Sequence, residues 1–521
     1  MRLITLLFLL TTAIGFAQQT DLIDVQCYRV ELTVNDESDS IKVIEAVEVL
    51  FLEDCPSFYL DLKSIGANGK GMLIDYKRGV KENGKSVQYQ QTGDKLFIET
   101  TNAKKGNTNT YVFSFTGIPD NGLIIGENKF GNRTFFGDNW PNRAHNWFAC
   151  VDHPSDKATI SFTVNAPAHY ECVATGVLKS STLVDTATRV FRYESIIPLP
   201  TKVMVVGIAD FVVVNHPAYL AAPITLWVYP EDSAAGFYDM RLAPNITAFF
   251  HTRIGQYPFE KLANVQSTTM FGGMENAGNI FYDENAINGR GTMEALMAHE
   301  IAHQWFGNSA SEQDWQHLWL SEGFATYFTN LYFEHEHGQE AFHSRLITER
   351  KKVIDFAKSY DHPVIDTTYS DLMDLLNANS YQKGSWFLHM LRTKIGDDVF
   401  WEGIRAYYAA YAFDNATSDD FRKVMEATAG VQLGDFFNQW LRQAGHPILH
   451  VTPGKKKIRI QQVQNGDFSF PLEIEYQFKD GSTESATYEI SEKQLVLKPD
   501  SKKKIKRVVL DPDVKLLFEE R

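Results

Sequence analysis

The chain has 521 residues, of which 44% are hydrophobic and 22% charged, so it holds enough apolar material for several domain cores. Its formal net charge of −15 argues against a nucleic-acid partner, because polyanions bind to basic surfaces.

The first seventeen residues have the layout of a secretory signal peptide. Arg2 supplies a positive charge, residues 3–16 form a mostly apolar run, and Gly15 and Ala17 are small residues two apart. The run is short for a membrane anchor, and no later segment reaches the roughly 18 apolar residues of a transmembrane helix. We therefore expect cleavage after Ala17 (a signal peptide over residues 1–17), export to the periplasm or the extracellular medium, and no transmembrane segment in the mature protein.

Alternation of apolar and polar residues with period two dominates the next part of the chain. Residues 28–34 and 159–164 both alternate, and Glu82-Asn83-Gly84 is a candidate turn. This pattern is typical of half-buried strands. It predicts an antiparallel β domain with one solvated face over residues 18–214.

Four cysteines lie in this first third of the chain, and none belongs to a CxxC pair. Export permits disulfides, and an even number allows two bridges in any of three pairings. Buried free thiols are an equal alternative, and the sequence does not decide between them. The four are Cys27, Cys55, Cys150 and Cys172.

From about residue 226 the periodicity becomes helical. A helix over residues 293–306 would begin at Thr292 as N-cap and end at Gly307, and a second over residues 321–337 would end at Gly338. An α-rich domain is therefore expected over residues 215–446. Further helices are expected at residues 339–358, 381–395, 399–411, 419–428 and 435–443.

The last part of the chain, residues 447–521, is rich in strand patterns. Residues 472–478 alternate cleanly and meet Asp480-Gly481, which is a hairpin signal. We expect a small β-sandwich domain here. The short basic runs at residues 455–457 and 502–504 are interpreted as solvated edges or turns.

The segment with the clearest chemistry is His299-Glu300-Ile301-Ala302-His303, an HExxH motif. Residues four apart share one helix face, so both imidazoles can reach one metal ion. Glu322 follows eighteen residues later, in an otherwise apolar stretch, and is the candidate third ligand. Two histidines and one glutamate leave the fourth position of a catalytic zinc ion open for water, from which Glu300 can take a proton.

This spacing resembles that of the gluzincin zinc aminopeptidases, the family of aminopeptidase N and the leukotriene-hydrolysing enzyme. Residues 272–276 match the family's G-x-M-E-N signature, and residues 381–384 resemble its tyrosine segment. Residues 140–154 resemble a motif of its amino-terminal domain, and residues 436–440 a motif at the end of its catalytic domain. The resemblance covers the chain from about Asp21 to Pro447 and depends on several motifs in order.

The resemblance implies a multidomain α+β fold with a thermolysin-like α-rich catalytic domain. It also implies one zinc ion and peptide substrates with a free N-terminus. In such enzymes Glu300 would be the general base, Tyr381 would stabilise the oxyanion, and Glu275 would bind the substrate's α-amino group. Gly272 and Gly273 would let backbone approach the substrate. The full substrate-binding set that we expect is Phe271, Gly272, Gly273, Met274, Glu275 and Asn276.

Two departures from the family's pattern stand out. Trp140 falls near the place of a Gln or Glu that shares amine binding in relatives, so this task would depend more heavily on Glu275. The chain has only 75 residues after residue 446, too few for the large helical domain that ends longer members. It is thus expected to be a short, secreted member of the family.

Two other functions remain open. An endopeptidase could use the same metal site but would have no amine to bind, and a non-catalytic binding module would not need an intact base. An epoxide-hydrolase side activity also stays open, as do the preferred N-terminal residue and the oligomeric state.

Overall fold

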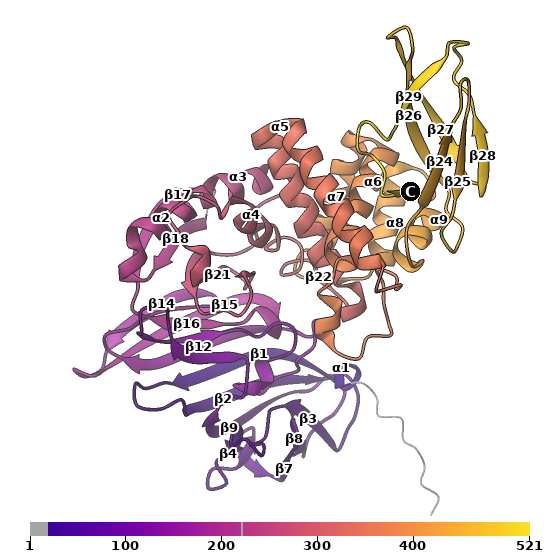
Figure 1. Cartoon of the computed structure of the whole chain (residues 1–521). Coiled ribbons are helices and arrows are strands. Elements are labelled where there is room, and N and C mark those ends of the chain that lie inside the picture. Colours follow the sequence, from indigo (N-terminus) through magenta and orange to yellow (C-terminus); the bar gives the residue numbers. More distant parts are fainter. Residues whose placement is uncertain (1–18, 220–221) are drawn as a thin grey trace, which may run out of the picture.

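The computed structural model describes residues 19–219 and 222–521, so the predicted signal peptide lies outside the described residues. The chain passes from β-sheets at its N-terminal end through a helical region to two further sheets at its C-terminal end (Figure 1). The predicted multidomain α+β fold is confirmed. No helix in the described ranges has both the length and the apolar character of a membrane span.

The largest sheet lies in the N-terminal region and has the order β14-β15-β12-β1-β2-β9-β5-β6, with β4 paired to β9. Along β12 every second residue is buried, as expected for a sheet with one solvated face. The nine strands are β1 (Ile23–Thr33), β2 (Ile41–Phe51), β4 (Gly71–Ile74), β5 (Val80–Glu82), β6 (Lys85–Val87), β9 (Thr108–Ile118), β12 (Lys157–Pro167), β14 (Val177–Leu183) and β15 (Thr188–Pro200).

The predicted antiparallel β domain is present, with one exception among its strand pairs. β1 and β12 run parallel, with Cys27 opposite Thr159. Parallel neighbours need a long connection, and the strands between β2 and β12 supply it. The predicted turn at Glu82-Asn83-Gly84 is confirmed, because Asn83 and Gly84 join β5 to β6 with φ values of 48° and 85°.

Two smaller sheets complete this region. One has the order β10-β11-β16-β13 and the other β3-β8-β7. All four cysteines are free thiols; Cys150 and Cys172 are buried, and Cys27 and Cys55 are half-buried. The strands are β3 (Ser57–Asp61), β7 (Tyr89–Thr92), β8 (Lys95–Glu99), β10 (Leu123–Glu127), β11 (Arg133–Gly137), β13 (Glu171–Ala174) and β16 (Val206–Ala209).

A five-stranded sheet of order β17-β18-β19-β21-β20 comes before the main helices. The expected change to helical structure near residue 226 was therefore too early. β19 is buried at every position, so it lacks the alternation by which a strand is recognised in sequence. The G-x-M-E-N segment enters this sheet as its edge strand β20. The strands are β17 (Val212–Tyr219), β18 (Ala222–Val228), β19 (Leu262–Ser267), β20 (Gly273–Met274) and β21 (Asn279–Asp283).

The two helices that carry the HExxH motif and Glu322 are α4 (Glu294–Ala302) and α5 (Trp319–Ala357). The expected N-cap at Thr292 was wrong: Met293 is the N-cap of α4, and the Thr292 hydroxyl instead accepts a hydrogen bond from Asn288. The predicted break at Gly338 is present as a non-helical residue inside α5. The other helices are α1 (Gln19–Leu22), α2 (Ser233–Asp239), α3 (Ala243–Arg253), α6 (Gly384–Ile395), α7 (Asp397–Tyr411), α8 (Ser418–Ala429) and α9 (Gly434–Phe437).

The C-terminal region is made of two sheets, of order β28-β25-β24-β30 and β27-β26-β29, which confirms the expected sandwich of strands. The predicted hairpin joins β26 to β27 around Asp480-Gly481. A short pair, β22 (Ser311–Glu312) and β23 (Asn415–Ala416), lies within the helical region. The C-terminal strands are β24 (Ile448–Pro453), β25 (Ile458–Gln462), β26 (Phe470–Phe478), β27 (Thr483–Ile490), β28 (Gln494–Leu497), β29 (Ile505–Leu510) and β30 (Glu519–Glu520).

Candidate active site

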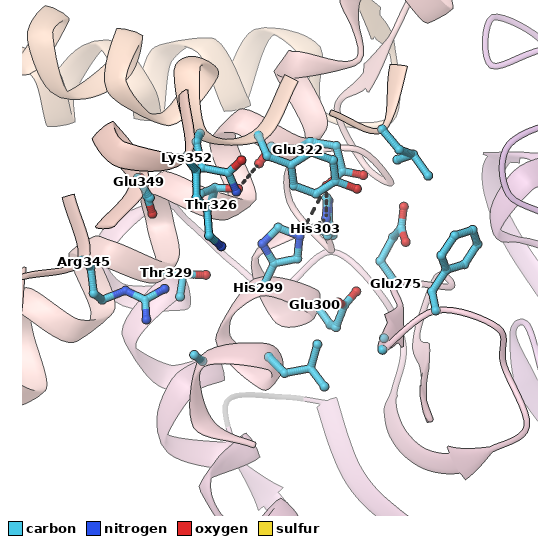
Figure 2. A pocket seen from close by; sticks show the side chains of 18 of the residues that line it. Glu275, His299, Glu300, His303, Glu322, Thr326, Thr329, Arg345, Glu349 and Lys352 are labelled. Carbon is cyan, nitrogen blue, oxygen red and sulfur yellow. Dashed lines mark hydrogen bonds and ion pairs between the residues drawn. The ribbon is translucent and has the colours of Figure 1, made fainter. Parts of the chain in front are cut away.

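The three predicted metal ligands converge at the contact between α4 and α5 (Figure 2). His299 lies in the last turn of α4, His303 is its C-cap, and Glu322 lies in the first turn of α5. The Nε2 atoms of His299 and His303 lie 3.3 and 3.2 Å from Glu322 Oε2, and 3.1 Å from each other. Tertiary packing thus joins a helix-spaced pair to a carboxylate on the next helix.

This set of donors fits a divalent cation such as zinc. One ligating atom each from His299, His303 and Glu322 lies within 4.8 Å of the others. The Glu322 side chain is 5% exposed, and apart from the two imidazoles its Oε2 atom has no hydrogen-bond partner within the described chain. Two imidazole nitrogens and one buried carboxylate oxygen that face a common point are the ligands of a catalytic zinc ion with an open fourth position.

Neighbouring groups orient His303 for this role. Its Nδ1 atom lies 3.1 Å from the carbonyl oxygen of Phe306 and 3.0 Å from Ser321 Oγ. A proton on Nδ1 that is donated to the Phe306 carbonyl leaves Nε2 free to bind metal. Gly307 makes room for this contact, because a Cβ atom there would lie 2.2 Å from Ser321 Oγ.

The pKa values of the two glutamates, Glu300 and Glu322, are shifted in opposite directions. Burial raises the pKa of Glu300 well above its ordinary range, and the nearby carboxylates of Glu275 and Glu322 raise it further. Burial would also raise the pKa of Glu322, but the neighbouring imidazoles, His303 foremost, lower it below its ordinary range. Glu300 is therefore the better proton acceptor, and Glu322 the better anionic ligand.

Glu300 packs directly over Gly273 of β20. A Cβ atom at Gly273 would lie 2.4 Å from Glu300 Oε1, whereas one at Gly272 would come no closer than 4.0 Å to Leu296. Both glycines line the cavity. Gly273 was expected to let the backbone approach the substrate. The structure adds a second reason for a glycine here, because a side chain would occupy the space of the Glu300 carboxylate.

Glu275 lies beside the same cluster. Its carboxylate belongs to a second group with Glu300 and His303 whose atoms lie within 4.8 Å of one another. The side chain is buried, and its Oε1 atom has no hydrogen-bond partner in the described chain. Its backbone carbonyl accepts bonds of 2.7 Å from both Gln304 Nε2 and Asn308 Nδ2, which tie the segment to the residues just after the HExxH helix.

Sequence reasoning did not identify Gln304 and Asn308. Both are completely buried amides immediately after the motif. Two amides directly after the motif are a weak sequence signal, because the carbonyl group of Glu275 that they bind lies about thirty residues upstream.

The other expected substrate-binding residues divide into two sets. Phe271 and Met274 line the cavity, and the Phe271 ring lies edge-on to Trp140 at 6.2 Å. Asn276 is completely buried and does not line the cavity, so the structure does not place its side chain against a substrate.

Tyr381 enters the cavity from a π-helical turn, Asn379–Lys383, that comes directly before α6. Its ring is stacked on that of His299, with centroids 6.0 Å apart and an interplanar angle of 11°. Burial, and then the carboxylates around it, raise the pKa of the phenol. The hydroxyl therefore keeps its proton and can act as a donor.

The three metal-ligating residues, Glu275, Glu300 and Tyr381 all line one cavity of about 540 Å³. Beyond the metal cluster the cavity continues along α5, past Thr326, Arg345, Glu349 and Lys352. Figure 2 shows these residues on one side of His299, with Glu275 on the other. No motif in the sequence marked this second end of the cavity.

Comparison with known proteins agrees with this arrangement. Residues 238–440 match the peptidase family M1 domain. The chain is 29% identical to human glutamyl aminopeptidase and 27% identical to the pig enzyme, over 62% and 60% of its own length. It is 24% identical to a probable aminopeptidase 2 of Sulfurisphaera tokodaii, over 76% of this chain and 53% of that protein. The chain spans about a third (35%) of the length of the mammalian relatives.

Proposed function

We propose that this chain, which belongs to peptidase family M1, is a zinc-dependent aminopeptidase that hydrolyses the N-terminal peptide bond of peptides. The observation that carries this proposal is the position of Glu275. Its buried carboxylate has an oxygen without a partner in the described chain, next to Glu300 and the cluster of metal-ligating residues. An α-ammonium group would satisfy that oxygen by a charge-assisted hydrogen bond.

The other residues of the site have matching roles in this proposal. His299, His303 and Glu322 would hold zinc, which when bound polarises a carbonyl and lowers the pKa of water. Glu300 accepts the proton of the attacking water and delivers it to the leaving amine. Tyr381 donates its hydroxyl proton in a hydrogen bond to the carbonyl oxygen as negative charge develops there.

The position of Glu275 favours this function over the endopeptidase alternative. An endopeptidase binds an uncharged peptide bond where an aminopeptidase binds the terminal ammonium. A buried carboxylate without a counter-charge would then be costly, because a charge in a dry site needs a partner.

Glu275→Gln tests the proposal with an isosteric change. The parent protein should cleave free-amine aminoacyl fluorogenic substrates at least about 10-fold better than their N-acetylated forms, since a charged hydrogen bond contributes about 1.5–3 kcal/mol. The variant should lose about 10- to 100-fold in kcat/KM on the free amines only. Zinc content, measured by metal analysis, should not change. Equal cleavage of acetylated substrates by the parent would establish the endopeptidase function instead.

We also propose that the protein is exported. The basic residue, apolar run and small residues of positions 1–17 support this, as does their fit to a cleavable leader. Sequencing the N-terminus of protein recovered from the periplasm or medium should give Gln18 as its first residue. An intact Met1 on cytoplasmic protein would contradict export.

A further inference from the structure

The end of the cavity opposite Glu275 carries positive charge. Arg345 and Lys352 both line it, from the half of α5 that follows Gly338. Figure 2 shows Arg345 and Glu275 on opposite sides of His299. A substrate whose amine lies at Glu275 and whose first carbonyl lies at the metal cluster would extend toward these two cations.

Arg345 is held in place without an ion pair to the described part of the chain. Its Nε atom donates a 2.7 Å hydrogen bond to Asn330 Oδ1, and its guanidinium lies 4.4 Å from the centre of the Phe333 ring. Its two Nη atoms have no hydrogen-bond or ion-pair partner among residues 19–219 and 222–521. The guanidinium is thus held in position and half-buried at the cavity wall, and its outer donors are left without a bond to the described protein.

Glu349 lines the same cavity as the two cations, and other residues bind its carboxyl group. Its oxygens accept hydrogen bonds of 2.8 Å from Asn330 Nδ2 and from Ser385 Oγ. Burial raises the pKa of Glu349 to about 7, so much of the group is uncharged near neutral pH. In the described structure Glu349 makes no ion pair with Arg345 or Lys352, whose charges lower its pKa less than burial raises it.

We propose that Arg345 and Lys352 form a subsite for a carboxylate on the leaving-group side of the scissile bond. This rests on the proposed aminopeptidase function and adds a substrate class to it: peptides that carry a negative charge close to the cleaved bond. The source of that charge is either the C-terminal carboxylate of a dipeptide or tripeptide or an acidic side chain at the second residue. The guanidinium fork matches the geometry of a carboxylate, and Lys352 adds a second positive charge.

Matched substrates test the subsite and separate the two sources. Xaa-Ala is compared with Xaa-Ala-amide, and Xaa-Asp-amide with Xaa-Asn-amide, where Xaa is the best-cleaved N-terminal residue. At least one carboxylate substrate should exceed its neutral partner by about 10-fold or more in kcat/KM. The pair that shows the preference identifies the source of the charge. Ratios near one for both pairs would overturn the proposal.

Three variants connect the preference to these residues. Arg345→Gln should lower the ratio to about threefold or less, and Lys352→Gln should lower it partially. Lys351→Gln is the matched control, because Lys351 is an exposed neighbour that does not line the cavity. An unchanged ratio in Arg345→Gln overturns the proposal. If that variant does not fold, an unchanged ratio in Lys352→Gln, whose side chain is exposed, does so.

An aminoacyl coumarin amide tests the proposed aminopeptidase function independently of the carboxylate subsite. That substrate has a free amine and no carboxylate. If the parent cleaves it, loss of the carboxylate preference refutes the subsite and leaves the aminopeptidase function standing. If the parent does not cleave it or any free-amine peptide, the function itself fails.

Discussion

At the scale of single residues, the proposed proton acceptor lies apart from the three proposed metal ligands. Glu300 lies between the two histidines in sequence, but its carboxylate is not part of the group formed by His299, His303 and Glu322. Its carboxylate instead lies over Gly273, facing the cavity. Glu300→Gln should therefore retain zinc and lose kcat by about three orders of magnitude, the scale of a removed general base.

The matching ligand variant is His299→Ala, which should lose both zinc and activity. Metal analysis after dialysis, beside turnover of a free-amine substrate, distinguishes the two effects. Normal turnover in Glu300→Gln would assign the base to another group.

Gly273 offers a finer test of how the base is held. An alanine Cβ at this position would lie 2.4 Å from Glu300 Oε1, so the carboxylate would have to move. Because misplacing a reacting group by about 1 Å can cost about 100-fold, we expect Gly273→Ala to lower kcat by at least about 10-fold with zinc retained.

Gly272→Ala is the control for this change. The nearest atom to its Cβ would be Leu296 Cδ1 at 4.0 Å, so Glu300 would keep its position and kcat should fall less than in Gly273→Ala. Equal effects of the two alanines would show that the packing of Glu300 on Gly273 is unimportant.

At the scale of elements, α5 connects the metal cluster to the cationic end of the cavity. Glu322 lies in its first turn, and Arg345 and Lys352 lie beyond Gly338, whose φ of 80° and ψ of −179° interrupt the helix. Only glycine adopts this backbone conformation without strain. Gly338→Ala should lower the free energy of unfolding by about 1–3 kcal/mol, entirely through the backbone, because a Cβ there has nothing within 4 Å.

Gly434→Ala in α9 is the comparison, since its Cβ also meets nothing within 4 Å and its φ is not positive. Chemical denaturation should show little or no loss of stability there. A Gly338→Ala protein as stable as the parent would mean that α5 can straighten, and its cavity residues should then be displaced.

At the scale of the whole molecule, a buried ion pair joins the N-terminal region to the helical region. Lys202, between β15 and β16, donates to Glu312 of β22, and their side chains are 2% and 0% exposed. Removing one partner leaves the other charge buried and unpaired. Lys202→Met should therefore reduce the free energy of unfolding by about 3–5 kcal/mol, measured by urea denaturation.

Arg29→Met is the control for this prediction. Arg29 pairs with Glu48 on the surface of the large sheet, with side chains 49% and 31% exposed, so its loss should cost less than about 1 kcal/mol. Adding Glu312→Gln to Lys202→Met should recover part of the lost stability. Equal effects of Lys202→Met and Arg29→Met would contradict an essential buried pair.

The sequence by itself determined the features that depend on local spacing. Four residues make about one helical turn, so the spacing of His299 and His303 is enough to put both on one face of a helix. The hairpin at Asp480-Gly481 likewise follows from a short turn between two alternating runs. In each case the interacting groups are near neighbours in the chain, so a local pattern describes the contact.

Only the tertiary structure decided the contacts that bring distant segments together. The parallel pairing of β1 with β12, the packing of Glu300 on Gly273, and the position of Arg345 beyond the metal cluster have no signature in the sequence around them. Periodicity reports which face of an element is buried, but not which surface covers it. That choice depends on how whole elements dock, and here the docking of α5 against α4 places a carboxylate beside two histidines and two cations at the far end of the same cavity.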